Sequence, residues 1–203
     1  MWQAVEPELV LASASPARAA LLTNAGVAAR VAPTSVDEAA IREAMTAEGA
    51  PPEELATALA ELKATRASTA DPGALIVAAD QILAADDTVL AKPATLKEAR
   101  EQLALLAGRE HRLISAVCVA EQGAVVWRHR DVARLRMRPL SDAFLDAYLD
   151  RMGEAALTTV GGYQLEGLGA QLFERVDGDW STVLGLPLLP LLGFLRQRRV
   201  LLS

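Results

Sequence analysis

The sequence predicts a mixed α/β fold in which a twisted sheet is flanked by helices. In the first half, short apolar runs typical of buried strands alternate with amphipathic segments of helical period. Residues 111–137 then show the alternation of an antiparallel hairpin. No repeat or low-complexity linker divides the 203 residues, which are enough to bury one large core. We therefore expect a single domain over residues 1–203.

Strands and helices of the first half are bounded by recognisable signals. In order, we expect a strand at 9–14, a helix at 17–25, a strand at 28–33, a helix starting within 35–45 and a long helix at 51–68. Gly26 ends the first helix, because glycine readily takes the left-handed conformation found beyond helix C-termini. Leu55, Leu59 and Leu62 are spaced to share one face of the long helix, with Lys63 beside them.

The second half begins with β-structure and ends with an apolar helix. The expected elements are a strand at 74–80, a hairpin over 82–93, a helix at 95–108, strands at 111–120 and 124–137, a helix at 141–152, a strand entering 174–180 and a helix at 184–199. The pair Asp86–Asp87 suits the turn of the first hairpin. Thr95 stands three residues before Glu98, which is the spacing of a capping box, and Gly108 ends that helix.

Composition excludes several classes of function. A net charge of −6 and 4% aromatic residues argue against stable nucleic-acid binding, which needs basic tracks and stacking platforms. No apolar stretch approaches the roughly 20 residues that span a bilayer. The first residues also lack the basic and apolar regions of a signal peptide, so we expect a cytoplasmic protein without membrane contact. The single cysteine, Cys118, lies in an apolar run and is expected in the core.

The stretch "LASASPAR" places polar residues where a strand passes into a helix. Unpaired N–H groups at a helix N-terminus form an anion site, to which Ser13, Ser15 and Arg18 would add donors. The alternative is structural: Ser15 is a good N-cap and Pro16 a good first helical residue. Local sequence leaves both interpretations standing.

An acidic residue, Asp80, directly follows the apolar run at 74–79. Open α/β sheets often present catalytic side chains at strand ends, and a carboxylate there can bind a divalent cation or accept a proton from water. An Asx turn or helix cap is the alternative. Lys63 and Lys92 could each be solvated charges, whereas together with Arg18 they would form a cationic clamp for a triphosphate.

The order of these motifs resembles the Maf family of nucleoside triphosphate pyrophosphatases over nearly the whole chain. The matching pieces are "LASASPAR", the acidic pair ending at Glu38, "LAELKA", "AADQ", "AKP", "HRLISAV", "EGLGAQLFERVDGD" and "VLGLPL". The resemblance implies a two-lobed fold with a central cleft, like that of inosine triphosphatases. It also implies hydrolysis of a nucleoside triphosphate to the monophosphate and pyrophosphate, with divalent Mg or Mn as cofactor, and a homodimer.

Site residues follow from the resemblance by position. Ser13, Ser15 and Arg18 match the phosphate loop, Asp80 the proposed general base, and Glu38, Lys63 and Lys92 the family's acidic residue and lysines; Glu38 and Asp80 would hold the metal. No Ser-His-Asp arrangement is evident among the two histidines, so water is the expected nucleophile. His111 also matches a family position, with a hydrogen-bonded structural role as the alternative.

Three further positions are associated with base selection in the family: Ala17, Gln81 and Glu166. The glutamine and glutamate are similar to the branch that hydrolyses 7-methyl-GTP, although that branch tends to carry a bulky aromatic where Ala17 stands. We expect ionised Glu166 to accept hydrogen bonds from a guanine edge and Gln81 to serve a purine carbonyl. A pyrophosphatase for thymidine and uridine triphosphates, and a non-catalytic nucleotide-binding regulator of septum formation, are the alternatives.

Overall fold

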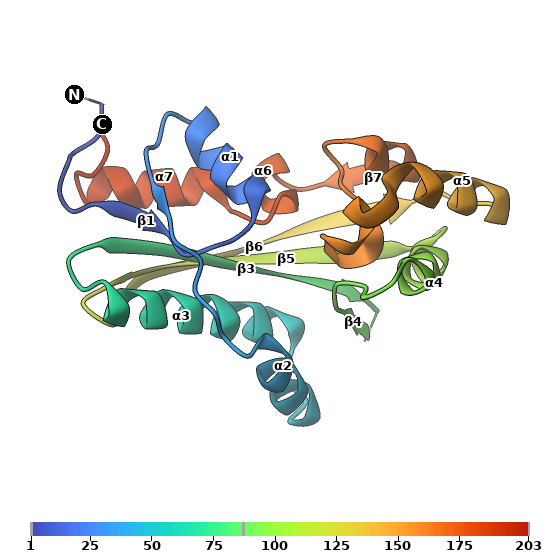
Figure 1. The fold of residues 1–203 in the computed structure, drawn as a ribbon, viewed down its shortest axis with the longest axis horizontal. Helices are drawn as coiled ribbons and strands as arrows, with labels where there is room; N and C mark the ends of the chain where they lie inside the picture. The colour runs from blue at the N-terminus through green and yellow to red at the C-terminus, as the bar shows by residue number, and fades with distance from the viewer. Residues whose placement is uncertain (1, 87, 203) are drawn as a thin grey trace. The chain divides into compact units, whose positions relative to one another are not determined.

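The computed structural model describes residues 2–86 and 88–202 and confirms the mixed α/β fold. Its seven-stranded sheet has the order β2-β1-β3-β5-β6-β7, and β4 pairs with β3 (Figure 1). Two compact units divide the chain: the first contains residues up to Gln81, Ile114–Asp131 and residues from Trp180 onward, and the second contains Ile82–Leu113 and Val132–Asp179. No helix in the described part of the chain is long and apolar enough to span a membrane.

In the first unit, the N-terminal half of the sheet is parallel. Its elements are β1 (Leu9–Leu11), α1 (Pro16–Asn24), β2 (Arg30–Val31), α2 (Glu38–Ala47), α3 (Pro52–Ala70), α6 (Trp180–Val183) and α7 (Leu188–Gln197). β1 pairs in parallel with both β2 and the start of β3 (Leu75–Ala85). Both short strands end earlier than the sequence predicted, because their pairing spans only these few residues.

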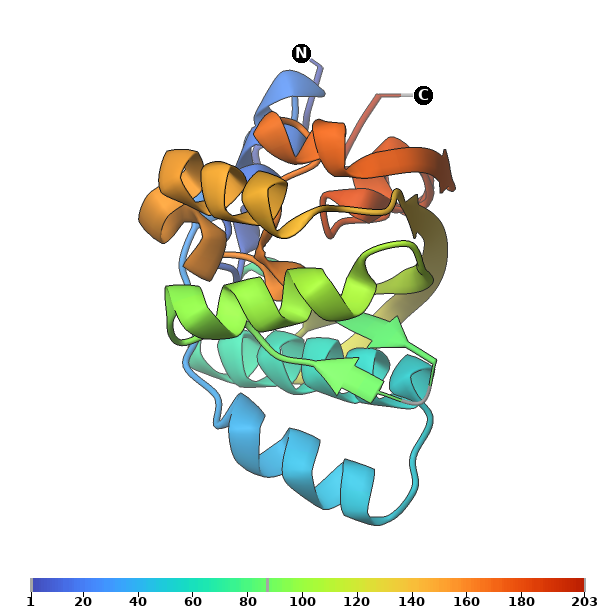
Figure 2. The same ribbon diagram turned by 90° about the vertical axis from the view of Figure 1, so that its right-hand side faces the viewer.

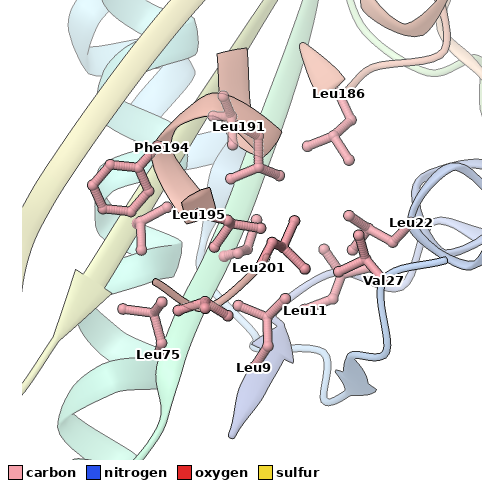
Figure 3. Close-up of a cluster of buried hydrophobic side chains, with 14 of the residues drawn as sticks. Leu9, Leu11, Leu22, Val27, Leu75, Leu186, Leu191, Phe194, Leu195 and Leu201 are labelled. Atoms are coloured by element: carbon pink, nitrogen blue, oxygen red, sulfur yellow. The ribbon is translucent and has the colours of Figure 1, made fainter. Parts of the chain in front are cut away.

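A hydrophobic core holds this unit together. Figure 3 shows Leu191 and Leu195 of α7 packed with leucines of β1 and β3. Leu9, Leu11 and Leu75 are at most 2% exposed, and each fully buried leucine contributes about 1.5–3 kcal/mol through apolar burial. Cys118 is also buried, as predicted, and burial raises the pKa of its thiol to about 12. The packing of the apolar strands against α7 therefore stabilises the unit that carries the polar residues described below.

The long helix α3 has a wider buried face than predicted. Leu55 and Leu59 are buried as expected, but Leu62 is 40% exposed, so its assignment to the apolar stripe was wrong. Lys63 takes the buried position instead. At 100° per residue, the buried residues 55, 59, 63, 56, 60 and 64 span one broad face in which position 63 is central, whereas position 62 lies outside its edge. α2 packs against α3 in the same unit, as both ribbon views show (Figures 1 and 2).

Strand β3 corrects the predicted position of Asp80. The sequence predicted that one strand ends at residue 80 and that a hairpin begins at residue 82. In the structure a single strand runs through Leu75–Ala85. Apolar residues on both sides of the Asp80–Gln81 pair keep the strand buried, so two polar side chains do not end it. β1 pairs only with Leu75–Val77, so Asp80 lies beyond the last residue paired to β1.

The second unit is antiparallel. Its elements are the end of β3, β4 (Thr88–Leu90), α4 (Leu96–Leu106), parts of β5 (Glu110–Glu121) and β6 (Ala124–Met137), α5 (Asp142–Met152), η1 (Gly153–Leu157), η2 (Val160–Gly162), η3 (Leu168–Leu172) and β7 (Phe173–Asp177). The β3–β4 hairpin is confirmed, with Asp86 at its turn; Asp87 lies outside the described residues. Thr95 caps α4 by accepting from the Glu98 N–H, as predicted. α4 packs beside α5 (Figure 2).

His111 has a structural contact in the second unit. Its Nε2 lies 2.8 Å from the hydroxyl of Tyr163, in the glycine-rich segment that follows α5. Burial lowers the pKa of His111 to about 4, so the ring is neutral near pH 7. This contact ties β5 to the segment that also carries Glu166.

The C-terminal helix predicted at 184–199 is shorter in the structure: α7 covers Leu188–Gln197, and the separate helix α6 precedes the predicted range. α6 ends at Val183 and α7 begins at Leu188, with Pro187 as its N-cap residue. Pro187 lacks an N–H and disfavours helical geometry at Leu186, so a continuous helix cannot pass through this point. The short connection brings the carbonyl groups of α6 into contact with polar side chains of the candidate site.

Candidate active site

An ion-pair cluster forms where α2, α3 and β3 meet in the first unit. The Lys63 ammonium lies 2.6 Å from a carboxylate oxygen of Glu38 and 2.6 Å from Oδ1 of Asp80. Lys63 and Asp80 are buried, whereas the Glu38 side chain is 45% exposed. A buried ammonium needs such partners, because an unpaired charge in the interior is strongly unfavourable. The structure thus brings together three residues that the sequence had proposed for catalysis.

The second oxygen of Asp80 is the chemically distinctive atom of this cluster. Oδ2 is buried and accepts no hydrogen bond from a described residue, although Oδ1 is paired with Lys63. Buried polar atoms are nearly always paired, so an unpaired carboxylate oxygen points to a ligand or a reacting proton. This atom can accept a proton from water or bind a hard cation.

The donor set also fits a divalent metal that is completed by substrate. No group of three or more histidine, cysteine, aspartate or glutamate side chains suited to a metal occurs among the described residues. Mg²⁺ is commonly held by only one or two carboxylates together with phosphate oxygens of the substrate. Glu38 and the unpaired oxygen of Asp80 supply these two carboxylates, so the residues present fit the predicted cofactor.

The loop before α1 has the structural role proposed for it. The Ser15 hydroxyl accepts from the Arg18 N–H at 3.4 Å, and Pro16 is the first helical residue, so Ser15 is an N-cap. Ser13 is buried, and its hydroxyl accepts from the Ser15 N–H. Capping and anion binding are compatible, because a serine hydroxyl that accepts one bond still has a proton to donate. Ala17 lies in the first turn of α1 and is partly buried.

Part of the Arg18 guanidinium forms hydrogen bonds within the protein. Nε donates to the Gly185 carbonyl at 2.8 Å, and Nη1 donates to the Ala79 carbonyl at 2.7 Å and to Ser13 Oγ at 3.2 Å. Burial lowers the pKa of Arg18, while the negative charges of Asp80 and Glu38 oppose that effect. The two N–H groups of Nη2 donate to no acceptor among the described residues. Arg18 is therefore held firmly and presents only this edge for phosphate.

Gly185 provides the space in which the Arg18 side chain lies. Its φ is +90°, and an added Cβ would stand 3.2 Å from Nε and 3.3 Å from Nη2 of Arg18. Gly185→Ala is expected to lower the free energy of unfolding by about 1–3 kcal/mol, more than a glycine of similar φ in open space, because crowding of Arg18 adds to the backbone strain and displaces the guanidinium. We would measure chemical denaturation of both this variant and Gly49→Ala, whose φ is +73° with nothing within 4 Å of the added Cβ. An equal loss in both variants would contradict crowding at Arg18.

Gln81 lies next to Asp80 in β3, but its side chain makes different contacts. Its Nε2 lies 3.0 Å from Ser115 Oγ, 3.1 Å from the Thr182 carbonyl and 3.0 Å from the Val183 carbonyl. Sequence reasoning missed Ser115, Thr182 and Gly185 as partners of the proposed site. The available signals were a serine in the otherwise apolar "LISAV" and the stretch "VLGLPL".

Lys92 and Glu166 belong to the second unit. Lys92 follows β4, and Glu166 lies in the turn between η2 and η3; both are exposed. No hydrogen bond or ion pair is recorded between either side chain and a described residue. The contacts described above therefore unite Glu38, Lys63 and Asp80, and separately Ser13 with Arg18, but include neither Lys92 nor Glu166. Their roles stay predictions.

Comparisons with known proteins identify the family of this chain. The family model described as Maf-like protein matches residues 8–198. The nucleoside triphosphate pyrophosphatase of Paramagnetospirillum magneticum is 52% identical over 188 residues, which cover 93% of this chain and 97% of that protein. The 7-methyl-GTP pyrophosphatase of Rhizobium meliloti is 48% identical over 193 residues, which cover 95% of this chain and 97% of that protein. The chain therefore belongs to the Maf-like protein family.

Proposed function

We propose that this protein is a hydrolase that converts a nucleoside triphosphate into the monophosphate and pyrophosphate. The observation that carries the proposal is the buried Asp80, whose Oδ2 accepts no bond from a described residue while Oδ1 is paired with Lys63. Relatives whose names specify nucleoside triphosphate and 7-methyl-GTP pyrophosphatases support the reaction class. Such an enzyme limits the entry of modified nucleotides into RNA and DNA.

Residues of the first unit have separate roles in the proposed reaction. Asp80 Oδ2 takes a proton from the attacking water, which then breaks the bond between the α-phosphate and the bridging oxygen to the β-phosphate. Lys63 keeps the other oxygen of Asp80 in place and adds positive charge. Arg18, through Nη2, and the N–H groups at the start of α1 stabilise charge on the phosphates as pyrophosphate leaves. When bound, a divalent Mg or Mn ion withdraws negative charge from the phosphates, and Glu38 and Asp80 are the residues that would hold it.

We propose 7-methyl-GTP as the preferred substrate. Glu166 is exposed and, when ionised, only accepts hydrogen bonds, which matches the N1–H and amine of a guanine. Methylation at N7 leaves the ring positively charged, so a carboxylate gains further attraction to it. Ala17 offers no aromatic ring to stack on that base, which limits the preference to what Glu166 provides.

Lys92 is proposed to contact phosphate alone. Lys92→Ala should reduce kcat/KM for the triphosphate about tenfold, the scale of one charge-assisted hydrogen bond, because a cationic contact to the β- or γ-phosphate is lost. Binding of the nucleoside should stay unchanged, which calorimetry can measure. Lys97→Ala is the matched control, because Lys97 is an exposed lysine in the same unit that pairs with Glu101 on the surface. Equal loss for triphosphate and nucleoside would contradict a phosphate contact.

A screen for pyrophosphate release tests the function itself. Purified protein would be incubated with ordinary and modified nucleoside triphosphates in the presence of magnesium or manganese, and pyrophosphate and monophosphate would be quantified. Equal amounts of both products are expected. Binding of nucleotide without product from any substrate would instead favour the non-catalytic regulator, and release of inorganic phosphate would point to a different cleavage site.

A further inference from the structure

The Gln81 side chain is held in one orientation by the carbonyl end of α6. Its Nε2 contacts the carbonyl oxygens of Thr182 and Val183, the last two residues of that helix. Helix C-termini leave such carbonyls without intrahelical partners, and a side-chain amide can satisfy them. Rotating the amide by 180° would put Oε1 against two carbonyl oxygens, which only accept. The orientation therefore follows from the chemistry of the partners.

Ser115 removes the remaining freedom of the amide nitrogen. The Ser115 hydroxyl donates its hydrogen to the Thr182 carbonyl at 2.8 Å. The hydroxyl oxygen, Oγ, therefore acts as the acceptor for Gln81 Nε2 at 3.0 Å. Thr182 is itself held, because its hydroxyl donates to Asp131 at 2.9 Å. An amide nitrogen has two hydrogens, and protein acceptors on Ser115 and α6 account for both. No N–H of Gln81 is left for a nucleotide.

We propose that Gln81 acts toward the nucleotide only as a hydrogen-bond acceptor, through Oε1, and that Ser115 helps the carbonyl end of α6 to position it. Oε1 accepts no hydrogen bond from a described residue and is not among the buried unpaired atoms. This replaces the expectation that Gln81 donates to a purine carbonyl. The proposal rests on the proposed function, because it assigns a specificity role to a residue of β3 whose side chain lies against the α6 end, where Arg18 also donates to the Gly185 carbonyl.

The chemistry required of the ligand is therefore an N–H or O–H donor. A guanine supplies the second hydrogen of its exocyclic amine, since Glu166 is assigned N1–H and the first amine hydrogen, and any ribonucleotide supplies ribose hydroxyls. A purine carbonyl cannot serve, because it has no hydrogen to give. The two admissible sources differ by single groups that can be removed from the ligand one at a time.

Binding of monophosphates tests the contact without requiring hydrolysis. Calorimetry would compare GMP with IMP, which lacks the amine, with the 2′-deoxy and 3′-deoxy forms of GMP, and with 6-thio-GMP, in which sulfur replaces the carbonyl oxygen while N1–H is kept. Wild type should lose about five- to tenfold in affinity for the amine-lacking or one hydroxyl-lacking analogue, as expected for one hydrogen bond. In Gln81→Met this loss should shrink to less than about twofold.

Control variants separate positioning from general destabilisation. Gln3→Met is matched, because both ends of the Gln3 amide bond the backbone of Ala28 in the same unit, and it should leave all affinity ratios unchanged. Ser115→Ala keeps Gln81 but removes one acceptor of its amide. This variant should therefore reduce the affinity ratio between GMP and the donor-lacking analogue by about twofold, the scale of a weak hydrogen bond. Thermal melts would confirm that every variant is folded.

Several results would overturn the proposal. One is a wild-type protein that binds none of the monophosphates or binds all of them equally. Another is an affinity ratio between GMP and a donor-lacking analogue that stays unchanged in Gln81→Met. A third is a Gln81-dependent loss of affinity seen only with the analogue that lacks the carbonyl oxygen. Pyrophosphate release by wild type is measured separately on triphosphates. Failure of the catalytic assignment is therefore distinguishable from failure of the acceptor assignment.

Discussion

Asp80→Asn is expected to lower kcat for pyrophosphate release by about 100- to 10,000-fold, the usual contribution of a general base. The structure indicates why so small a change has this effect. Oδ2 is a buried acceptor without a partner, and asparagine would place either a donor or a weakly basic amide oxygen there. Neither takes a proton from water or binds a divalent cation well.

The Asp80→Asn variant should remain folded. Lys63 keeps Glu38 as its counter-ion at 2.6 Å, so the substitution does not leave a buried ammonium unpaired. Single-turnover kinetics and thermal melts would be measured for this variant and for Asp71→Asn, whose carboxylate makes an exposed ion pair with Arg30 in the same unit. Turnover near that of wild type would remove Asp80 from the mechanism.

Glu166→Gln is expected to reduce the preference for 7-methyl-GTP over UTP and dTTP by about 5- to 150-fold, equivalent to 1–3 kcal/mol. The carboxylate accepts two hydrogen bonds from the guanine edge and attracts its positive charge, whereas the amide is neutral and presents one donor group. Specificity constants for 7-methyl-GTP, GTP, UTP and dTTP, with wild type and variant, measure this effect.

The control for Glu166→Gln is Glu154→Gln, an exposed glutamate in η1 of the same unit. It removes the same charge from the unit, so it reports any long-range electrostatic effect on the nucleotide. A wild type that already favours the pyrimidine nucleotides, or a ranking unchanged by Glu166→Gln, would show that Glu166 does not select the base. The pyrophosphatase proposal would stand in either case.

Local features of the fold were predictable from sequence alone. Thr95 with Glu98 and Gly26 after α1 both occupy the capping positions expected of them. Such signals depend on hydrogen bonds among residues within about one helical turn, so they act whatever the rest of the chain does. The β5–β6 hairpin likewise followed from alternation and a short turn.

The identities of candidate site residues were also within reach of the sequence. Lys63, Asp80 and Glu38 were proposed from their residue types and their resemblance to a family pattern, and the structure places them in one cluster. What the sequence could not show was the state of each atom. Asp80 was expected at a strand end but lies within β3, because apolar residues on both sides continue the buried strand.

Tertiary structure alone decided which atoms remain available for a ligand. Arg18 and Gly185 are 167 positions apart, and Gln81 and Thr182 are 101 positions apart. Contacts at such separations depend on how the whole unit packs, which no local pattern encodes. Sequence by itself therefore determined the elements, their caps and the candidate residues. The packing of α6 against β3 and α1 determined that Arg18 presents Nη2 and that Gln81 presents its oxygen, because buried donors and acceptors must first satisfy one another.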